Sequence, residues 1–203
     1  YNQECKLIIP ENGFISLNVP LTKTRLGTFS TKTTHPKYIY ILNSILDEIG
    51  IGNKLFNPYS FFTKGEMILN CSSQKALKNN IAHTVSCSKG GLYIQRFHGS
   101  EKHCGHCTPC VIRQAAVYKA EYQKYDCGYH YDDIVNNPPS SVSKSGSDIQ
   151  AFKIGIQRIK ENRENTFFDL LLSGELPGTD KELNKYQSVF LRGLKEVDNF
   201  LSN

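Results

Sequence analysis

Residues 104–110 run Cys104-Gly105-His106-Cys107-Thr108-Pro109-Cys110, and this stretch decides most of what the sequence predicts. Two cysteines separated by two residues can bind one ion from a tight turn, and two such turns overlap here. Gly105 permits the turn conformation, and Pro109 stiffens the start of the helix that we expect to follow. Thiolates this close repel one another without a cation, so the spacing predicts a metal ion between them.

Zinc prefers four ligands in a tetrahedron, so one position is left for a more distant residue. Cys87 is the strongest candidate, because it ends a predicted strand and the intervening segment is long enough to fold back. The other candidates for this position are His98, His103, His106, Cys71 and Cys127. An iron–sulfur cluster is disfavoured because no further cysteine follows closely after the third one. We therefore predict a zinc ion on Cys87, Cys104, Cys107 and Cys110. Four thiolates leave no open position for water, so this site would stabilise the fold and not catalyse.

The composition is that of an ordinary soluble globular protein, with 39% hydrophobic and 21% charged residues in a chain of 203. The formal net charge of +5 is mild and more typical of a solvated lysine-rich surface than of a nucleic-acid interface, so no nucleic-acid partner is expected. No apolar run is long enough to span a bilayer, and no signal peptide opens the chain. These features predict a cytoplasmic protein that does not bind a membrane.

The apolar pattern predicts short elements in the first two thirds of the chain. A buried strand is expected at 7–9, ended by Pro10, and two further strands at 84–86 and 92–94. A helix should begin near Pro36 and stop at Gly50. Thr63 and Glu66 have capping-box spacing for a short helix, and further helices are expected at 74–81 and 110–122.

Residues 136–147 contain two prolines and five serines and are the clearest linker in the chain. Beyond this linker the sequence is helical. One apolar stripe follows Asp148, and a longer one follows a second capping box at Thr179 and Glu182. The stripes consist of Ile149, Phe152, Ile156 and Ile159, and of Leu183, Tyr186, Phe190, Leu194, Val197 and Leu201. We therefore predict an α/β domain over 1–135, a linker over 136–147 and a helical C-terminal extension over 148–203.

Four features in this order resemble the C-terminal portion of QueC-type 7-cyano-7-deazaguanine synthases. They are Glu11-Asn12-Gly13, Thr33-Thr34-His35-Pro36, Thr63-Lys64-Gly65-Glu66, and Cys87 with the three-cysteine stretch. The resemblance spans about residues 7–118, and the cysteine pattern is its most specific part. The longer threonine-rich loop and the helical tail are more similar to QatC, the QueC-like component of the Qat antiphage defence system.

The resemblance implies an α/β fold, as a portion of a Rossmann-like PP-loop ATPase (adenine nucleotide alpha hydrolase-like) domain with a zinc knuckle. Members of this family use ATP and Mg²⁺ to adenylate the carboxylate of 7-carboxy-7-deazaguanine, which ammonia or another amine then attacks. The defence relatives imply a partner protein as acceptor. The family's Ser-Gly-Gly-x-Asp-Ser loop has no counterpart here, so we expect the nucleotide-binding half to lie upstream of Tyr1 in the complete protein.

The resemblance also suggests where a substrate would bind, although it identifies no catalytic residue. Residues after a strand or before a helix can contact a ligand or an anion, and a first-turn lysine can reach a nucleotide. A turn, a helix cap or a solvated surface would explain each of them as well. The candidate substrate-binding residues are Glu11, Asn12, Thr33, Thr34, His35 and Lys64. The alternative function is a non-catalytic, zinc-stapled module that docks a partner protein.

Overall fold

The computed structural model describes residues 5–22, 32–90, 102–143 and 145–203. The chain is mostly helical, with a small two-stranded parallel sheet and a buried cluster of four cysteines. It divides into two compact units, one built from Tyr1–Thr63 and Ile159–Arg192, the other from Lys64–Arg158 and Gly193–Asn203. We call them unit 1 and unit 2. The predicted division at the linker 136–147 stays a prediction.

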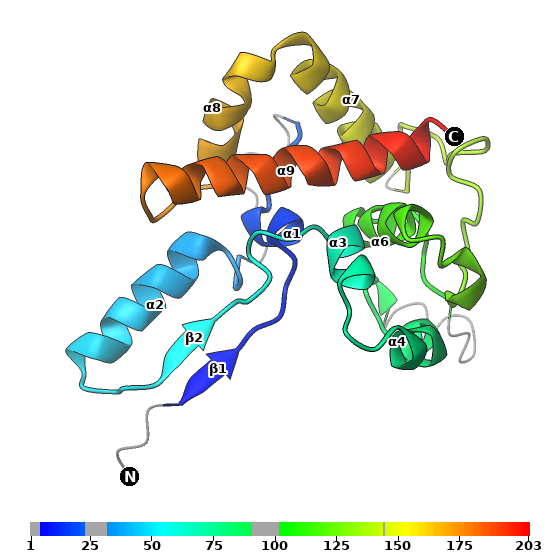
Figure 1. The fold of residues 1–203 in the computed structure, drawn as a ribbon. Coiled ribbons are helices and arrows are strands. Elements are labelled where there is room, and N and C mark those ends of the chain that lie inside the picture. Colours follow the sequence, from blue (N-terminus) through cyan, green and yellow to red (C-terminus); the bar gives the residue numbers. More distant parts are fainter. Residues whose placement is uncertain (1–4, 23–31, 91–101, 144) are drawn as a thin grey trace. The chain divides into compact units, whose positions relative to one another are not determined.

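The sheet belongs to unit 1 and pairs β1 (Lys6–Ile8) with β2 (Lys54–Phe56), as Figure 1 shows in blue and cyan. The strand expected at 7–9 is therefore present, shifted by one residue. The expectation that it is buried is wrong, because Leu7 is 61% and Ile8 50% exposed. A strand is buried only where other segments cover it, and its own apolar sequence does not ensure that.

The helix predicted from Pro36 is confirmed as α2 (Pro36–Glu48), which lies against β2. Its Asn43 closes the outer edge of β2: the side-chain oxygen accepts from Leu55 N at 2.8 Å, and the side-chain nitrogen donates to Leu55 O at 3.0 Å. Gly50 follows the helix with φ +73°, in the left-handed region that favours glycine after a helix end.

The core of unit 1 lies between α1 (Gly13–Leu17), α8 (Thr166–Leu171) and the first half of α9 (Asp180–Leu201). Phe14 packs on the fully buried Phe190, with ring centroids 5.9 Å apart. Gly13 is required at its position, because a Cβ atom there would lie 1.9 Å from the Ser60 carbonyl oxygen. The second predicted capping box is present at the start of α9, where Thr179 N donates to the Glu182 carboxylate at 2.9 Å.

Unit 2 contains α3 (Lys64–Leu69), α4 (Gln74–Asn80), α6 (Thr108–Lys119), most of α7 (Ser147–Glu161) and the end of α9. Short 3-10 helices lie at η2 (Ile81–His83) and η3 (Gln123–Tyr125), and a third, η4 (Arg163–Asn165), belongs to unit 1. The helices predicted to begin at 64, 74 and 110 are confirmed within two residues. The stripe predicted on α7 is confirmed by burial of Ile149, Phe152, Ile156 and Ile159.

The strand predicted at 84–86 is wrong, because these residues have irregular backbone. The Thr84 carbonyl accepts a hydrogen bond from the Arg113 guanidinium at 3.0 Å instead of from a neighbouring strand, and Val85 is 67% exposed. The strand predicted at 92–94 lies outside the described residues. None of the helices in the described ranges combines the length and apolar character that crossing a bilayer requires.

Candidate metal centre

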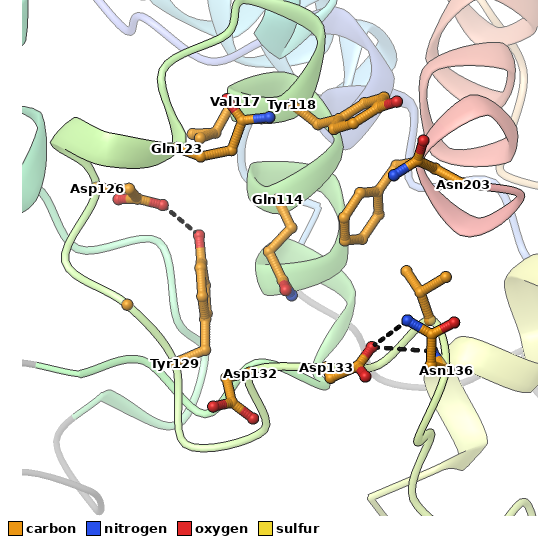
Figure 2. Close-up of a pocket in the computed structure, with 13 residues that line it drawn as sticks. Gln114, Val117, Tyr118, Gln123, Asp126, Tyr129, Asp132, Asp133, Asn136 and Asn203 are labelled. Carbon is orange, nitrogen blue, oxygen red and sulfur yellow. Dashed lines mark hydrogen bonds between the residues drawn. The ribbon is translucent and has the colours of Figure 1, made fainter.

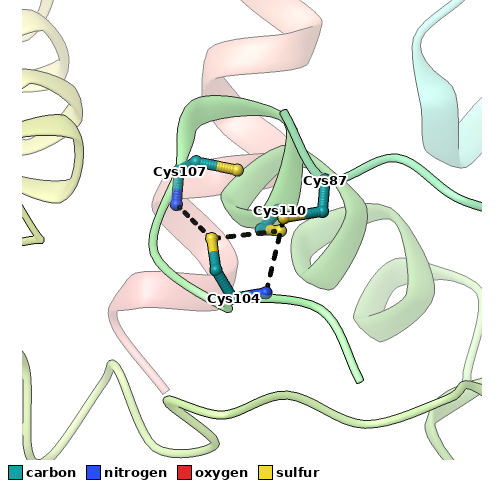
Figure 3. A group of neighbouring side chains, drawn as sticks. All are labelled: Cys87, Cys104, Cys107 and Cys110. Carbon is teal, nitrogen blue, oxygen red and sulfur yellow. Dashed lines mark hydrogen bonds between the residues drawn. The ribbon is translucent and has the colours of Figure 1, made fainter. Parts of the chain in front are cut away.

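The side chains of Cys87, Cys104, Cys107 and Cys110 converge on one point in unit 2 (Figure 3). Their sulfur atoms all lie within 4.8 Å of one another, and none of the four residues is more than 8% exposed. The Cys104 and Cys110 sulfurs are 3.8 Å apart. A tetrahedral zinc site with Zn–S bonds of about 2.3 Å has sulfur–sulfur edges of about 3.8 Å. The group could therefore hold a metal ion such as zinc.

Three of the ligands are positioned by the turn that leads into α6. Cys107 is the N-cap of this helix, and Cys110 lies in its first turn. Gly105 adopts φ +86°, and a Cβ atom there would lie 2.3 Å from the Tyr131 carbonyl oxygen, so only glycine fits. The Asp148 carboxylate accepts hydrogen bonds from Thr108 N at 2.8 Å and from the Thr108 hydroxyl at 3.0 Å. These two bonds fix the start of the helix.

Backbone amides point at the sulfur atoms. Lys89 N donates to Cys87 Sγ at 3.4 Å, Cys104 N to the same sulfur at 3.5 Å, and Cys107 N to Cys104 Sγ at 3.4 Å. Such N–H donors stabilise thiolates and hold ligand side chains in the orientation that a metal needs. The donors also link the segment that carries Cys87 to the turn that carries the other three cysteines.

Hydrogen bonds among the sulfurs separate their pKa values. The bond from Cys104 lowers the pKa of Cys107, and the same contact raises the pKa of Cys104 to about 12. The pKa of Cys110 is raised by its hydrogen bonds with Cys104 and Cys107. One thiolate is thus favoured at the expense of its neighbours. Ionising all four sulfurs requires a cation between them.

The other candidates for the fourth ligand position lie outside this group wherever the structure describes them. His103 Nδ1 is 3.7 Å from Cys127 Sγ, and the His106 ring packs edge-on against Tyr131 with centroids 5.1 Å apart. Burial lowers the pKa of both histidines, which favours their neutral form. Cys71 Sγ lies 3.7 Å from the Ser73 carbonyl oxygen. His98 lies outside the described residues.

A buried ion pair supports the cluster and was missed in the sequence. Arg113 Nη2 lies 2.6 Å from Asp126 Oδ1, and the two side chains are 4% and 3% exposed. Arg113 also donates to Ile81 O at 2.6 Å and Thr84 O at 3.0 Å, which ties the segment leading to Cys87 to α6. The Tyr129 hydroxyl donates to the same carboxylate. The available signal was an arginine directly after the apolar pair Val111-Ile112 in the helix predicted at 110–122.

Two of the candidate substrate residues have local structural roles. Asn12 is fully buried and is the N-cap of α1, because its side-chain oxygen accepts from Ile15 N at 3.0 Å. The Glu11 carboxylate accepts from the Asn12 amide nitrogens at 3.0 and 2.8 Å. Both residues therefore follow β1 as predicted, and a turn accounts for their contacts.

His35 has a comparable role as N-cap of α2. Its Nδ1 accepts from Lys37 N at 3.2 Å, and its Nε2 lies 3.2 Å from Ser173 Oγ. Burial, together with the charge of Lys32, lowers the His35 pKa to about 4. The ring is thus neutral, which disfavours a role as anion-binding cation.

The remaining candidates lie in both units. Thr33 and Thr34 form the turn before α2. Lys64 opens α3 in unit 2, where its amine donates to Ser86 Oγ at 3.3 Å, whereas the other five belong to unit 1. Their shared role in binding a substrate stays a prediction.

No protein-family model, curated protein or solved structure matches this chain. The class that the structure defines is a mostly helical chain with a two-stranded parallel sheet and a buried four-cysteine cluster that could hold a metal ion such as zinc.

Proposed function

We propose that the four cysteines hold a structural zinc ion and that the chain is part of a QueC-like ATP-dependent enzyme. The complete enzyme would adenylate the carboxylate of 7-carboxy-7-deazaguanine with ATP and Mg²⁺, for attack by ammonia or by an amine of a partner protein in antiphage defence. Zinc bound by four sulfurs has no open position, so it would stabilise the fold and take no part in the reaction.

Closed geometry supports the structural role of the metal. The 3.8 Å sulfur separation fits tetrahedral zinc, and backbone amides already orient the sulfurs of Cys87 and Cys104. An ion there would join the segment after η2 to the N-terminus of α6. Those two segments have no strand pairing to hold them together in the described part of unit 2, so the ion would replace it.

One observation supports the larger proposal: within the described residues, the sheet of unit 1 has only two strands. Ile9 N donates to Phe56 O at 2.9 Å and Lys54 N to Cys5 O at 3.1 Å, so alternate β1 residues face β2. The backbone groups of Lys6 and Ile8 therefore face the other edge. Because Asn43 occupies the outer edge of β2, the β1 edge is the one that could accept another strand among the described residues.

Exposed apolar side chains around this sheet also support the addition of further structure. Leu7, Ile8 and Phe56 are 61%, 50% and 49% exposed. The exposed face of α2 is apolar as well and consists of Tyr38, Ile41, Ile45 and Ile49, which are 45%, 45%, 46% and 61% exposed. Parallel sheets are normally covered on both faces by helices. Further α/β structure, of the kind that a Rossmann-like PP-loop domain supplies, would bury these residues and add the ATP site.

The same surface favours a second candidate function, a zinc-stapled module without activity. Exposed apolar patches of this kind also mark protein–protein interfaces. A partner protein that adds a strand to β1 and covers α2 would satisfy the surface equally well.

ATP–pyrophosphate exchange by the complete native protein separates the two candidates. Exchange that depends on 7-carboxy-7-deazaguanine supports the enzyme. A complete protein that binds a partner through α2 but catalyses no exchange, with that partner present, supports the module. A Lys64→Ala variant, compared with Lys185→Ala on α9, then tests whether Lys64 contributes to nucleotide binding through the KM for ATP.

A further inference from the structure

Unit 2 contains a second feature that neither the zinc site nor the proposed reaction uses. A cavity of about 370 Å³ lies beside α6, bounded by the loop that follows η3 and by the end of α9 (Figure 2). Its apolar lining comes from Val117, Tyr118, Val135 and Phe200. Cavities of this size, apolar with a few convergent polar groups, are typical of small-molecule sites.

The charged lining residues all carry carboxylates. They are Asp126, Asp132 and Asp133, and the lining includes no lysine, arginine or histidine. Arg113 neutralises Asp126, whereas Asp133 accepts only uncharged donors, from Asn136 N at 2.9 Å and Nδ2 at 3.3 Å. Asp132 is exposed and has no hydrogen-bond donor within the described residues. Within the described residues, two negative charges therefore line this cavity without a cationic partner, which favours a cation over an anion.

Gln114 adds an unmet acceptor. The residue is only 6% exposed, and its Nε2 donates to the Gly105 carbonyl at 2.7 Å and to the Cys110 carbonyl at 3.4 Å. With the nitrogen fixed in this way, Oε1 accepts from no donor within the described ranges. Figure 2 shows this side chain extending from α6 between Tyr129 and Asp133. This oxygen belongs to a residue that lines the cavity, so it could accept a hydrogen bond from a ligand N–H.

Aromatic rings form part of the wall. The rings of Tyr118 and Phe200 have centroids 5.9 Å apart at 53°, and both line the cavity. Tyr129 lines it too, with its hydroxyl turned to Asp126. Ring faces favour a planar partner and attract a cation.

We propose that this cavity binds a small, flat organic cation whose edge carries only N–H donors, such as an amidine or a protonated amino-heterocycle. The ring of the ligand would pack against Tyr118 and Phe200. Its charged N–H edge would face Asp132 and Asp133 and donate to Gln114 Oε1. This proposal stands on the cavity alone and is independent of the reaction proposed above.

Three isosteric probes test it on the zinc-loaded full chain: benzamidine, benzamide and benzoate, which are cationic, neutral and anionic. Titration calorimetry or amide chemical shifts should give benzamidine a Kd of about 1 mM or tighter, since a small ligand with one charged contact reaches that range. Benzamide should bind about tenfold more weakly, and benzoate should not bind. Asp132→Asn should weaken benzamidine about fivefold, the effect of losing roughly 1 kcal/mol, while Asp180→Asn on α9 should change nothing.

Asp132 is the suitable position because it makes no bond that the fold needs in the described structure, whereas Gln114 also holds the cysteine turn. Equal binding of benzamidine and benzamide would overturn the proposal, because charge would then play no part. So would an unchanged benzamidine affinity in Asp132→Asn, or no shift at residues lining the cavity at about 10 mM benzamidine, well above the expected Kd.

Discussion

The cysteine cluster of unit 2 and the sheet of unit 1 differ in burial. The cluster is at most 8% exposed, and its sulfurs accept hydrogen bonds from nearby amides. The sheet exposes Leu7 and Ile8 by half or more. The turn that carries three of the cysteines depends on residues close in sequence, whereas a parallel strand depends on cover from distant segments. The three-cysteine turn is thus specified locally, whereas the sheet would have to be covered by distant segments, and none covers Leu7 and Ile8 within the described residues.

The largest expected effect is loss of the metal. Structural zinc sites contribute about 10 kcal/mol or more of binding free energy, which is folding free energy where no site exists in the unfolded chain. Cys107→Ser, or chelation, should therefore unfold the segments around the cluster. Hydrogen exchange should show lost protection of the amides from 102 to 117, while α2 in unit 1 keeps its protection.

Cys5→Ser is the matched control, because this exposed cysteine lies outside the cluster. It should retain one zinc ion per chain by elemental analysis and the exchange pattern of the parent. A folded, fully protected sample without bound metal would refute the structural role.

The second effect concerns the ion pair behind the cluster. Arg113→Leu leaves the Asp126 carboxylate buried without its partner, which should lower the free energy of unfolding by about 3–5 kcal/mol in urea titrations. Burial opposes ionisation of Asp126, but the hydrogen bonds from Arg113 and Tyr129 outweigh it and lower its pKa. The stabilisation is therefore present above the unfolded-state pKa of about 3.9 and is lost as pH falls through the folded-state value.

A double variant, Arg113→Leu with Asp126→Leu, checks this explanation. Removing both charges should restore part of the lost stability, because an apolar pair leaves no buried charge unpaired. If the double variant is as unstable as the sum of the single variants, packing of the arginine and not its charge is what matters.

Local chemistry is what the sequence predicted well. Pro36 starts α2, Thr179 and Glu182 cap α9, and the three-cysteine stretch leads into α6, since each signal acts within a few residues. Cys87 was predicted as the fourth ligand because it is a cysteine like the three at 104–110. The grouping of all four cysteines is confirmed by the structure.

Contacts between distant segments could not be predicted. The strand expected at 84–86 fails because Arg113, some thirty residues away, takes the Thr84 carbonyl. The capping of β2 by Asn43 and the cavity at Asp132 likewise depend on how helices and loops come together. Periodicity reports which residues are apolar, and it does not report what will cover them.

A third, smaller effect is the pH dependence of stability that His35 causes. This histidine is buried in unit 1. Burial and then the charge of Lys32 lower its pKa from 6.5 to about 4, so the folded state holds the ring neutral. The unfolded chain binds more protons between these values, so the stabilisation is full above pH 6.5 and lost toward pH 4. The loss should reach at most about 3 kcal/mol.

His35→Asn should flatten this pH dependence, because asparagine keeps an N-cap acceptor without titrating in this range. The free energy of unfolding, measured by urea between pH 4 and 7, gives the comparison. His83→Asn removes an exposed histidine and should leave the slope unchanged. An unaltered slope in His35→Asn would assign the pH dependence to other groups.

The smallest effect probes the open surface directly, by comparing two isoleucines that differ mainly in burial. Ile45 on α2 is 46% exposed and Ile149 on α7 is 3% exposed. Ile45→Ala should change the stability of this chain by less than about 0.5 kcal/mol, whereas Ile149→Ala should cost about 2–4 kcal/mol. No described segment covers the exposed face of α2. Ile45→Ala should therefore lower the free energy of unfolding substantially only when an α/β region or a partner that covers this face is added. An equal cost at both positions in this chain alone would mean that Ile45 is already buried and that α2 needs no further cover.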